Sequence, residues 1–249
     1  MNRRSFLKGL LFFSSIFTLQ LKASKKNNVS FNYGVASGDP TNTNIILWTK
    51  VSPTFNKDVT VKWQLSADKN FKNILNSGYI SAKYSNDFTV KVDVNVPKPF
   101  RGNKVFYRFL FNDNISDTGI TNTLPQNNPD KYNIAFCSCS NHPAGYFNAY
   151  REIAKNNDID LVLHLGDYIY EYDKDGYATE DSKRFNRVVD PKHEIVSLND
   201  YRRRHAQYKS DLDLQALHKS KPMIAVWDEH EFTNDSWKYR AENHQNEEG

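Results

Sequence analysis

Three short polar clusters contain the residue types that metal-dependent hydrolysis requires. Each cluster begins where an apolar run with the composition of a buried strand ends. The clusters are Cys139-Ser140-Asn141-His142, Gly166-Asp167-Tyr168-Ile169-Tyr170 and Asp228-Glu229-His230-Glu231. In open α/β sheets the carboxyl ends of parallel strands form the edge at which ligands bind. The sequence therefore predicts that the three clusters converge on one site.

The donor atoms of the first two clusters are those that a transition metal prefers. A carboxylate such as Asp167 can bridge two metal ions, and the phenol of Tyr170 can reach the same ion from the loop that follows. A phenolate suits a hard, highly charged cation such as Fe(III), whereas the thiolate of Cys139 favours a transition metal over Mg²⁺ or Ca²⁺. These residue types predict one transition-metal position.

The third cluster predicts a second, harder cation. Asp228 and Glu229 supply carboxylates, which suit Ca²⁺ or Mg²⁺. Two ions about 3.5–4 Å apart can activate water and stabilise the attacking and leaving oxygens of a phosphoryl transfer. His230 is then the candidate catalytic acid that protonates the leaving oxygen.

The elements expected to position these clusters form a β-α-β unit within residues 131–249. The apolar runs 132–137, 161–165 and 223–227 predict buried strands, and residues 144–156 and 198–218 predict helices. Strands alternating with helices indicate a parallel sheet. A long polar insert, residues 171–197, separates the second strand from the second helix.

Residues 29–126 have a different pattern, typical of an all-β domain. Strand-like segments at 45–49, 59–65, 88–94 and 105–111 are separated by Gly, Pro and Asn turns. Their number and spacing predict a β-sandwich of the immunoglobulin or fibronectin type. The polar, proline-bearing segment 124–130 is expected to link it to the α/β region.

The first 24 residues account for the positive charge of the chain. The formal net charge is +4, and this segment carries Arg3, Arg4, Lys8 and Lys22 without any acid. The rest of the chain is near neutrality, which argues against a nucleic-acid-binding surface. A twin arginine before a short apolar run predicts export by the twin-arginine machinery, to the periplasm or the medium. The run is shorter than the about 20 residues that span a bilayer, so no stable membrane span is expected.

Other reactive side chains have structural interpretations. Cys137 and Cys139 lie two residues apart in one predicted strand, a geometry unsuited to a disulfide, and Cys137 is expected to pack in the core. We interpret His164 as supporting the site or the core, and His142 as either solvated or substrate-facing. The run 202–204 of three arginines is expected on a solvated helix face.

Several long segments, in order, resemble the PhoD-like alkaline phosphatases of the metallophosphoesterases. They are Tyr33-Gly34-Val35-Ala36-Ser37-Gly38-Asp39-Pro40 with Ile46-Leu47-Trp48-Thr49, Phe136-Cys137-Ser138-Cys139-Ser140, His164-Leu165-Gly166-Asp167-Tyr168-Ile169-Tyr170-Glu171-Tyr172, Tyr201-Arg202 through Gln207-Tyr208-Lys209, and Trp227-Asp228-Glu229-His230-Glu231-Phe232-Thr233-Asn234-Asp235. The resemblance covers nearly the whole chain. It implies an α/β metallophosphoesterase sandwich, present in part, preceded by the β-sandwich.

The resemblance also implies cofactors and an activity. The family's iron ligands fall on Cys139, Asp167 and Tyr170, and Asp167 also touches calcium. Glu229 stands where the family usually has Asp, so either Asp228 or Glu229 serves the calcium side, with Asp228 slightly favoured. The implied reaction is hydrolysis of phosphate mono- and diesters by a metal-bound hydroxide, with Fe(3+) and Ca(2+) as cofactors.

The family's later Gly-Asp-x-His segment is not found before Gly249. If the chain is complete, the iron site lacks a histidine and an acid, and the chain is expected to be inactive. If it is a C-terminally truncated fragment of a longer product, which we expect, the predicted activity stands. The alternative function is that of a secreted β-sandwich binding module without catalysis.

Overall fold

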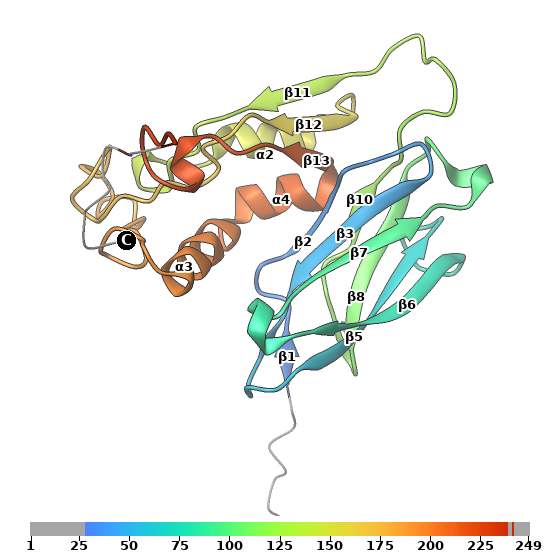
Figure 1. Cartoon of the computed structure of the whole chain (residues 1–249). Coiled ribbons are helices and arrows are strands. Elements are labelled where there is room, and N and C mark those ends of the chain that lie inside the picture. The colour runs from blue at the N-terminus through green and yellow to red at the C-terminus, as the bar shows by residue number, and fades with distance from the viewer. Residues whose placement is uncertain (1–27, 239–240, 242–249) are drawn as a thin grey trace, which may run out of the picture.

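The computed structural model describes residues 28–238 and residue 241. The predicted export signal at residues 1–24 lies outside the described residues. The described part of the chain is built around two large sheets and three α-helices (Figure 1). In the described part, we find no helix with both the length and the apolar character needed to cross a membrane.

The first of the two large sheets is antiparallel and lies wholly in the N-terminal region. Its strands run in the order β10-β8-β5-β6, with β9 pairing with β8. Their bounds are β5 Val59–Ser66, β6 Ile74–Ala82, β8 Val105–Phe111, β9 Asn114–Ile115 and β10 Gly119–Thr121. A separate short pair joins β1 Val29–Ser30 to β4 Ser52–Pro53.

The second large sheet joins the N-terminal region to the α/β region. Its order is β11-β12-β13-β2-β3-β7. The bounds are β2 Val35–Gly38, β3 Asn44–Lys50, β7 Thr89–Asn95, β11 Ile134–Cys137, β12 Leu161–His164 and β13 Pro222–Ala225. β11, β12 and β13 run parallel, as the sequence predicts, and β13 also pairs in parallel with β2. The β-rich region therefore extends the central sheet of the α/β region.

The contact between β2 and β13 requires a glycine. A Cβ atom added at Gly38 would lie 2.5 Å from the carbonyl oxygen of Met223, which is closer than such atoms can approach. The two strands pair at Ser37 with Pro222 and at Gly38 with Met223. The small residue thus allows the two regions to share one hydrogen-bonded sheet.

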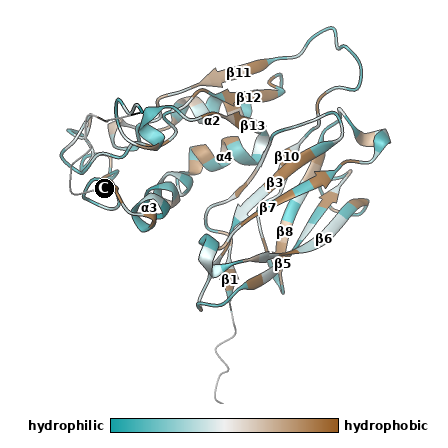
Figure 2. Cartoon of the chain, viewed as in Figure 1, coloured by the Kyte–Doolittle hydropathy of each residue, from teal (hydrophilic) through white to brown (hydrophobic). Residues whose placement is uncertain are grey.

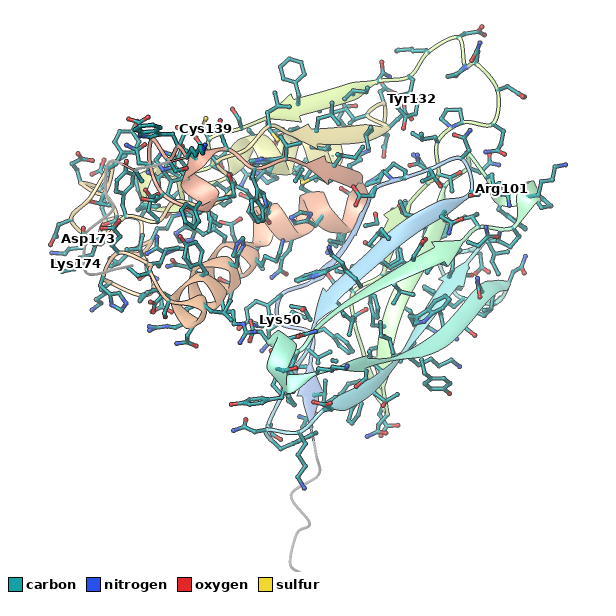
Figure 3. The ribbon with its side chains drawn as sticks, in the orientation of Figure 1. Lys50, Arg101, Tyr132, Cys139, Asp173 and Lys174 are labelled. Carbon is teal, nitrogen blue, oxygen red and sulfur yellow. The ribbon has the colours of Figure 1, made fainter. Side chains whose placement is uncertain are left out.

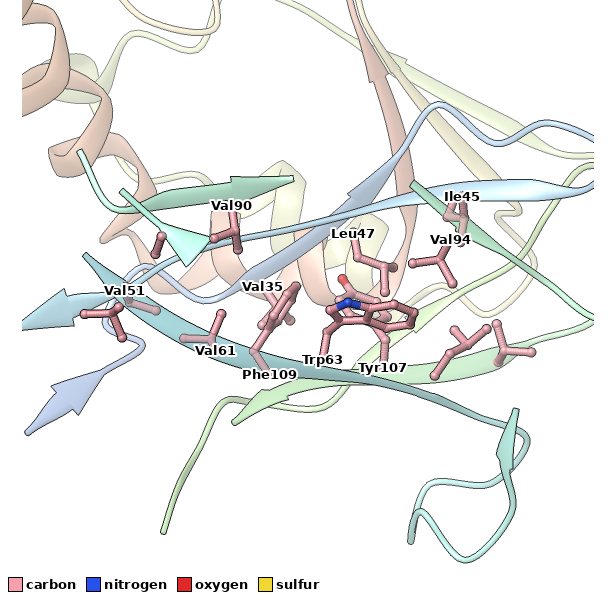
Figure 4. Close-up of a cluster of buried hydrophobic side chains, with 14 of the residues drawn as sticks. Val35, Ile45, Leu47, Val51, Val61, Trp63, Val90, Val94, Tyr107 and Phe109 are labelled. Atoms are coloured by element: carbon pink, nitrogen blue, oxygen red, sulfur yellow. The ribbon is translucent and has the colours of Figure 1, made fainter. Parts of the chain in front are cut away.

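The N-terminal core lies between β2-β3-β7 and the first sheet (Figure 4). Along β3, buried and half-buried residues alternate, so that Ile45 and Leu47 point inward and are fully buried. Trp63 and Phe109 contribute from the opposing sheet. Each such side chain contributes about 1.5–3 kcal/mol through burial. The two-layered β arrangement is confirmed, and its assignment to the immunoglobulin or fibronectin type stays a prediction.

Three helices accompany the parallel strands: α2 Asn148–Lys155, α3 Leu198–Lys209 and α4 Leu212–Ser220. Phe147, Tyr150, Val162, Leu214 and Leu217 belong to the second core, formed between helices and strands. Figure 2 shows polar loops at the end of the molecule where β11, β12 and β13 terminate, and apolar strands within the sandwich.

The helices differ from the prediction at their ends. The single helix predicted over 198–218 is two helices, because Asp211 caps a new one by accepting hydrogen bonds from the amides of Asp213 and Leu214. α3 begins with a capping box between Ser197 and Asp200. The helix predicted from residue 144 begins at Asn148, after the 3₁₀ turn His142–Ala144.

Candidate metal centre

The parallel register brings the three polar clusters to one edge of the sheet. Cys137 is opposite His164, and His164 is opposite Ala225, so the segments that follow these residues leave the sheet side by side. Backbone hydrogen bonds also join the segments beyond the strands, where the amide of Cys139 donates to the Gly166 carbonyl at 3.2 Å. Figure 3 shows Cys139 at this edge, beside the loops of the insert. The predicted convergence is therefore present.

The backbone at this edge adopts conformations that are uncommon for its residues. Cys139 and Asp167 have φ angles of 58° and 53°, in the left-handed region. Gly166 has φ 106°, and a Cβ atom there would lie 2.4 Å from Cβ of Asp228. Left-handed non-glycine residues concentrate at functional sites, where the surrounding structure holds them. Here they turn two candidate ligands away from their strands.

The structure brings Asp167, Glu229 and His230 together, with one candidate ligand atom from each within 4.8 Å of the others. The Tyr170 hydroxyl donates a hydrogen bond to Oδ2 of Asp167 at 3.2 Å. Cys139 is exposed and lines a hollow together with Tyr170. Of the predicted ligands, Tyr170 and Glu229 thus lie beside the Asp167 carboxylate.

The choice between Asp228, which the sequence slightly favoured, and Glu229 stays a prediction. The side chain of Asp228 is exposed and caps the short helix η4, Glu229–Glu231, by accepting from the Glu229 amide at 3.1 Å. Glu229, with the longer side chain, is the acid in the group with Asp167. The Asp228 carboxylate remains within hydrogen-bonding reach of Glu229.

The donor set suits a cation. Asp167 is 7% exposed, and its Oδ1 atom has no hydrogen-bond partner within the described residues. Burial, and next the Asp167 charge, raises the pKa of Tyr170, while a hydrogen bond to Asp228 and nearby carboxylates raise the pKa of Glu229. Such crowding of acidic groups around a partnerless oxygen would be relieved by a bound cation. The residues present therefore fit a metal.

Comparison with known proteins supports the same interpretation. The family model for the PhoD-like phosphatase matches residues 134–249, and the model for the PhoD-like phosphatase N-terminal domain matches residues 18–125. The chain belongs to the PhoD-like phosphatase family. The resemblance found in the sequence is thereby confirmed.

Two members of the PhoD-like family can be compared directly. Alkaline phosphatase D of Bacillus subtilis (strain 168) is 38% identical over 237 residues, which cover 91% of this chain and 40% of that protein. A solved structure described as "Structure of PhoD" matches with a TM-score of 0.78 and 36% identity, over 88% of this chain and 43% of the other. This chain therefore spans less than half the length of either relative.

The candidate acid His230 is held by a carboxylate that our sequence analysis missed. Nδ1 of His230 lies 2.8 Å from Oε2 of Glu171, which is fully buried. The other Glu171 oxygen accepts from the Asn234 amide at 2.7 Å. Burial alone would lower the pKa of His230, but the hydrogen bond and charge of Glu171 outweigh it and raise that pKa. In this PhoD-like chain, Glu171 orients the histidine.

A second missed residue, Glu231, connects two of the clusters. Its carboxylate accepts hydrogen bonds from the amides of Asp167 at 3.0 Å and Asp228 at 2.8 Å, and also from that of Tyr168. The sequence offered a signal, because Glu231 belongs to the Asp228–Glu231 cluster. Glu171 also lies in a segment that resembles the family, directly after Tyr170, but its partner His230 lies far along the chain, so no local pattern indicated the pair.

His164, His142 and Cys137, which the sequence also singled out, have structural partners. His164 is buried, with its Nε2 2.9 Å from the Tyr150 hydroxyl and 3.2 Å from that of Ser140, in agreement with a supporting role. His142 is neither solvated nor exposed: it is buried and its ring contacts that of Tyr208. Cys137 is half-buried against the second core, as predicted.

The predicted solvated arginine run is wrong for one of its members. Arg204 is fully buried, and its guanidinium donates to the carbonyls of Tyr170, Tyr172, Asp190 and Pro191. These carbonyls belong to the loop after Tyr170 and to a later part of the insert. Arg204 therefore holds the insert close to the candidate metal centre.

Proposed function

We propose that this chain provides an iron and calcium site of an exported phosphatase that hydrolyses phosphate mono- and diesters. Cys139, Asp167 and Tyr170 would hold Fe(3+), and Asp167 and Glu229 would hold Ca(2+), with Asp228 adjacent. Family membership supports a phosphatase. The observation that carries the metal assignment is the buried, partnerless Oδ1 of Asp167 among these donors.

The metals would polarise the phosphate ester and activate the attacking water. The protein's own residues supply the other requirements. His230, oriented by Glu171 at 2.8 Å, would donate the proton to the leaving oxygen. Glu231 fixes the backbone of the Asp167 loop by accepting its amides. Tyr170 would lose its proton on binding the metal, because its hydroxyl now donates to Asp167.

The alternative is a secreted β-sandwich binding module in which the α/β region keeps a partial metal site without catalysis. Because β2 is hydrogen-bonded to β13, the two regions share one sheet under either proposal. The two are separated by activity: the binding module predicts no hydrolysis of phosphate esters by the metal-loaded protein.

The two cysteines offer a matched test of the metal proposal. Cys139→Ser should remove iron from protein purified from an exporting host, whereas Cys137→Ser should retain it, because Cys137 packs against the core. The measurements are metal content by mass spectrometry and hydrolysis of p-nitrophenyl phosphate and bis(p-nitrophenyl) phosphate. Iron unchanged in Cys139→Ser would contradict the proposed ligand set.

The proposed export depends on Arg3 and Arg4. Replacing both by lysine should leave the protein in the cytoplasm of a host with a twin-arginine pathway. The readout is immunoblotting of cell fractions, and periplasmic accumulation of the double variant would contradict the proposal.

A further inference from the structure

A groove of about 550 Å³ lies between the N-terminal sandwich and α3, beside the candidate metal centre. Its lining includes Trp48 from β3, Tyr201, Arg202 and Lys209 from α3, and Trp227 and Phe232 on either side of η4. Figure 3 shows Lys50, another lining residue, where the sandwich faces α3. We call this the aromatic groove.

The aromatic groove has cations whose charges are not neutralised by an ion pair. Nζ of Lys209 donates to the Tyr168 hydroxyl at 2.8 Å and lies 4.9 Å from the centre of the Trp48 ring. Arg202 donates to the Ser85 carbonyl at 2.6 Å. Neither forms an ion pair with an acid of the described part of the chain. The charge of the groove is therefore suited to an anion.

The acids lining the aromatic groove already have partners. Asp87 forms an ion pair with Lys50. Glu231 accepts from the backbone amides of Asp167, Tyr168 and Asp228. These interactions leave Lys209 and Arg202 as the cations that can meet a ligand.

Aromatic rings line the same groove and remain accessible. The side chains of Trp227 and Phe232 are 84% and 65% exposed, although large apolar rings are ordinarily buried. Trp48 and Tyr201 line the same groove, and the Tyr201 hydroxyl donates to the Phe232 carbonyl. Exposed rings gathered beside a cation are suited to a ligand that is both planar and anionic.

We propose that the aromatic groove binds a nucleotide unit, a planar base with its phosphate, as the non-reacting part of a diester substrate. The base would stack on Trp227 and Trp48, and the phosphate would contact Lys209 and Arg202. This substrate class rests on the phosphatase activity proposed above. The groove volume lies within the range of about 300–1,000 Å³ that small-molecule sites occupy, and nucleic-acid bases stack readily on aromatic side chains.

The groove and the candidate metal centre share one short segment. Trp227 precedes Asp228 directly, and Phe232 follows Glu231 directly. Glu229 and His230 approach Asp167, whereas Trp227 and Phe232 line the groove. A diester bound across this segment would place one end in the aromatic groove and the other at the metals.

Binding can be tested without metals, which separates this inference from the proposed catalysis. Isothermal titration calorimetry on the chain in EDTA would compare adenosine 5′-monophosphate with ribose 5-phosphate, which lacks the base, and adenosine, which lacks the phosphate. We expect each partial ligand to bind at least about ten-fold more weakly, a loss of about 1.4 kcal/mol. Equal binding of ribose 5-phosphate would overturn the role of the rings.

Variants locate the binding. Trp227→Ala and Lys209→Met should each weaken binding of adenosine 5′-monophosphate by about ten-fold or more. Tyr79→Ala, at an aromatic residue that is 73% exposed on β6, and Asp167→Asn should leave it unchanged. Unaltered binding in Trp227→Ala, or its loss in Asp167→Asn, would overturn the proposal. If adenosine 5′-monophosphate bound as expected but the metal-loaded protein hydrolysed no phosphate ester, only the proposed phosphatase function would be contradicted.

Discussion

The two regions of the chain bury polar groups of different kinds. In the described residues up to 126, the buried polar side chains are all hydroxyls: Ser37, Thr49, Ser66, Ser116, Thr121 and Thr123. From residue 131 onward they include ionisable groups: His142, His164, Asp167, Glu171, Arg187, Arg204, His218, Lys221 and His230. Burying an ionisable group is far more costly than burying a hydroxyl.

The kinds of buried polar group show that the sandwich serves stability, whereas the α/β region carries the groups that could do chemistry. The sandwich gains its stability from apolar packing alone. In the α/β region, buried ionisable groups stabilise the fold only through specific partners, as Glu171 does for His230. One sheet joins both regions, so an apolar framework positions a polar site that would be poorly stable by itself. Four changes test this contrast.

The largest effect should come from the sandwich core. Phe109→Ala removes a fully buried ring and should lower the free energy of unfolding by about 4 kcal/mol. Urea denaturation measures the change. The control is Tyr79→Ala on β6, where an exposed ring is lost and the change should stay within about 0.5 kcal/mol. Similar losses in the two variants would contradict the assigned core.

In the α/β region, Arg204→Met should lower the free energy of unfolding by about 3 kcal/mol, because several backbone carbonyls lose their buried donor. Hydrogen exchange should increase mainly in the insert at 171–197. Arg203→Met, which removes an exposed ion pair with Asp190, should change stability by less than about 1 kcal/mol. If hydrogen exchange increased equally in the sandwich, the insert would not be the segment that Arg204 holds.

Glu171→Gln should affect catalysis more than the fold. Loss of the carboxylate that orients His230 should lower kcat for hydrolysis of a phosphate monoester by at least about 100-fold, with the metal content unchanged, because His230 is the proposed proton donor. Glu180→Gln, at an exposed acid of the same insert, is the matched control. If both variants kept the kcat of the parent protein, Glu171 would have a structural role only.

The smallest effect is a pH dependence. Burial lowers the pKa of Lys209 to about 8, whereas in the unfolded chain it is about 10.4. Between these values the unfolded state binds more protons at Lys209, so this residue should make the free energy of unfolding rise with pH, by at most about 1.4 kcal/mol per pH unit. Burial raises the pKa of Cys137 to about 11, so Cys137 opposes this rise above about pH 8.5. His205 and His218, beside Lys209, have pKa values lowered by burial and stay neutral in this range, and burial keeps Tyr168 protonated.

Urea denaturation at pH 7.5, 8.5 and 9.5 measures this slope. Lys209→Met should remove the contribution of Lys209 to the rise of the free energy of unfolding with pH. Lys183→Met, at an exposed lysine, should leave that rise unchanged. A slope that persists in Lys209→Met would assign the pH dependence to other groups.

The sequence predicted the parts of the site that depend on strand ends. Apolar runs followed by Cys139, Asp167 and Asp228–Glu231 were enough to predict their convergence, because parallel strands end at the same edge. The sequence left open whether Asp228 or Glu229 binds the second cation, because the direction of each carboxylate depends on how η4 turns after the strand.

Pairings distant in the chain were also missed. Alternation predicted the strands at 59–65 and 88–94, but no pattern predicted that β2 would pair with β13, because periodicity identifies the face of a strand and not its neighbour. Arg204 was placed on a solvated face for a related reason. The carbonyls that it satisfies belong to a loop whose path no local pattern specifies.

The pairing of β2 with β13 also sets an order of events during synthesis. β2 is made before residues 39–221, and its partner at Pro222–Ala225 emerges from the ribosome only after that whole segment. Until then, one edge of β2 has unpaired backbone groups, and such edges promote association between chains. We expect nascent chains that stop before residue 222 to aggregate or to recruit chaperones, and this late closure of the sheet to limit how fast the protein matures.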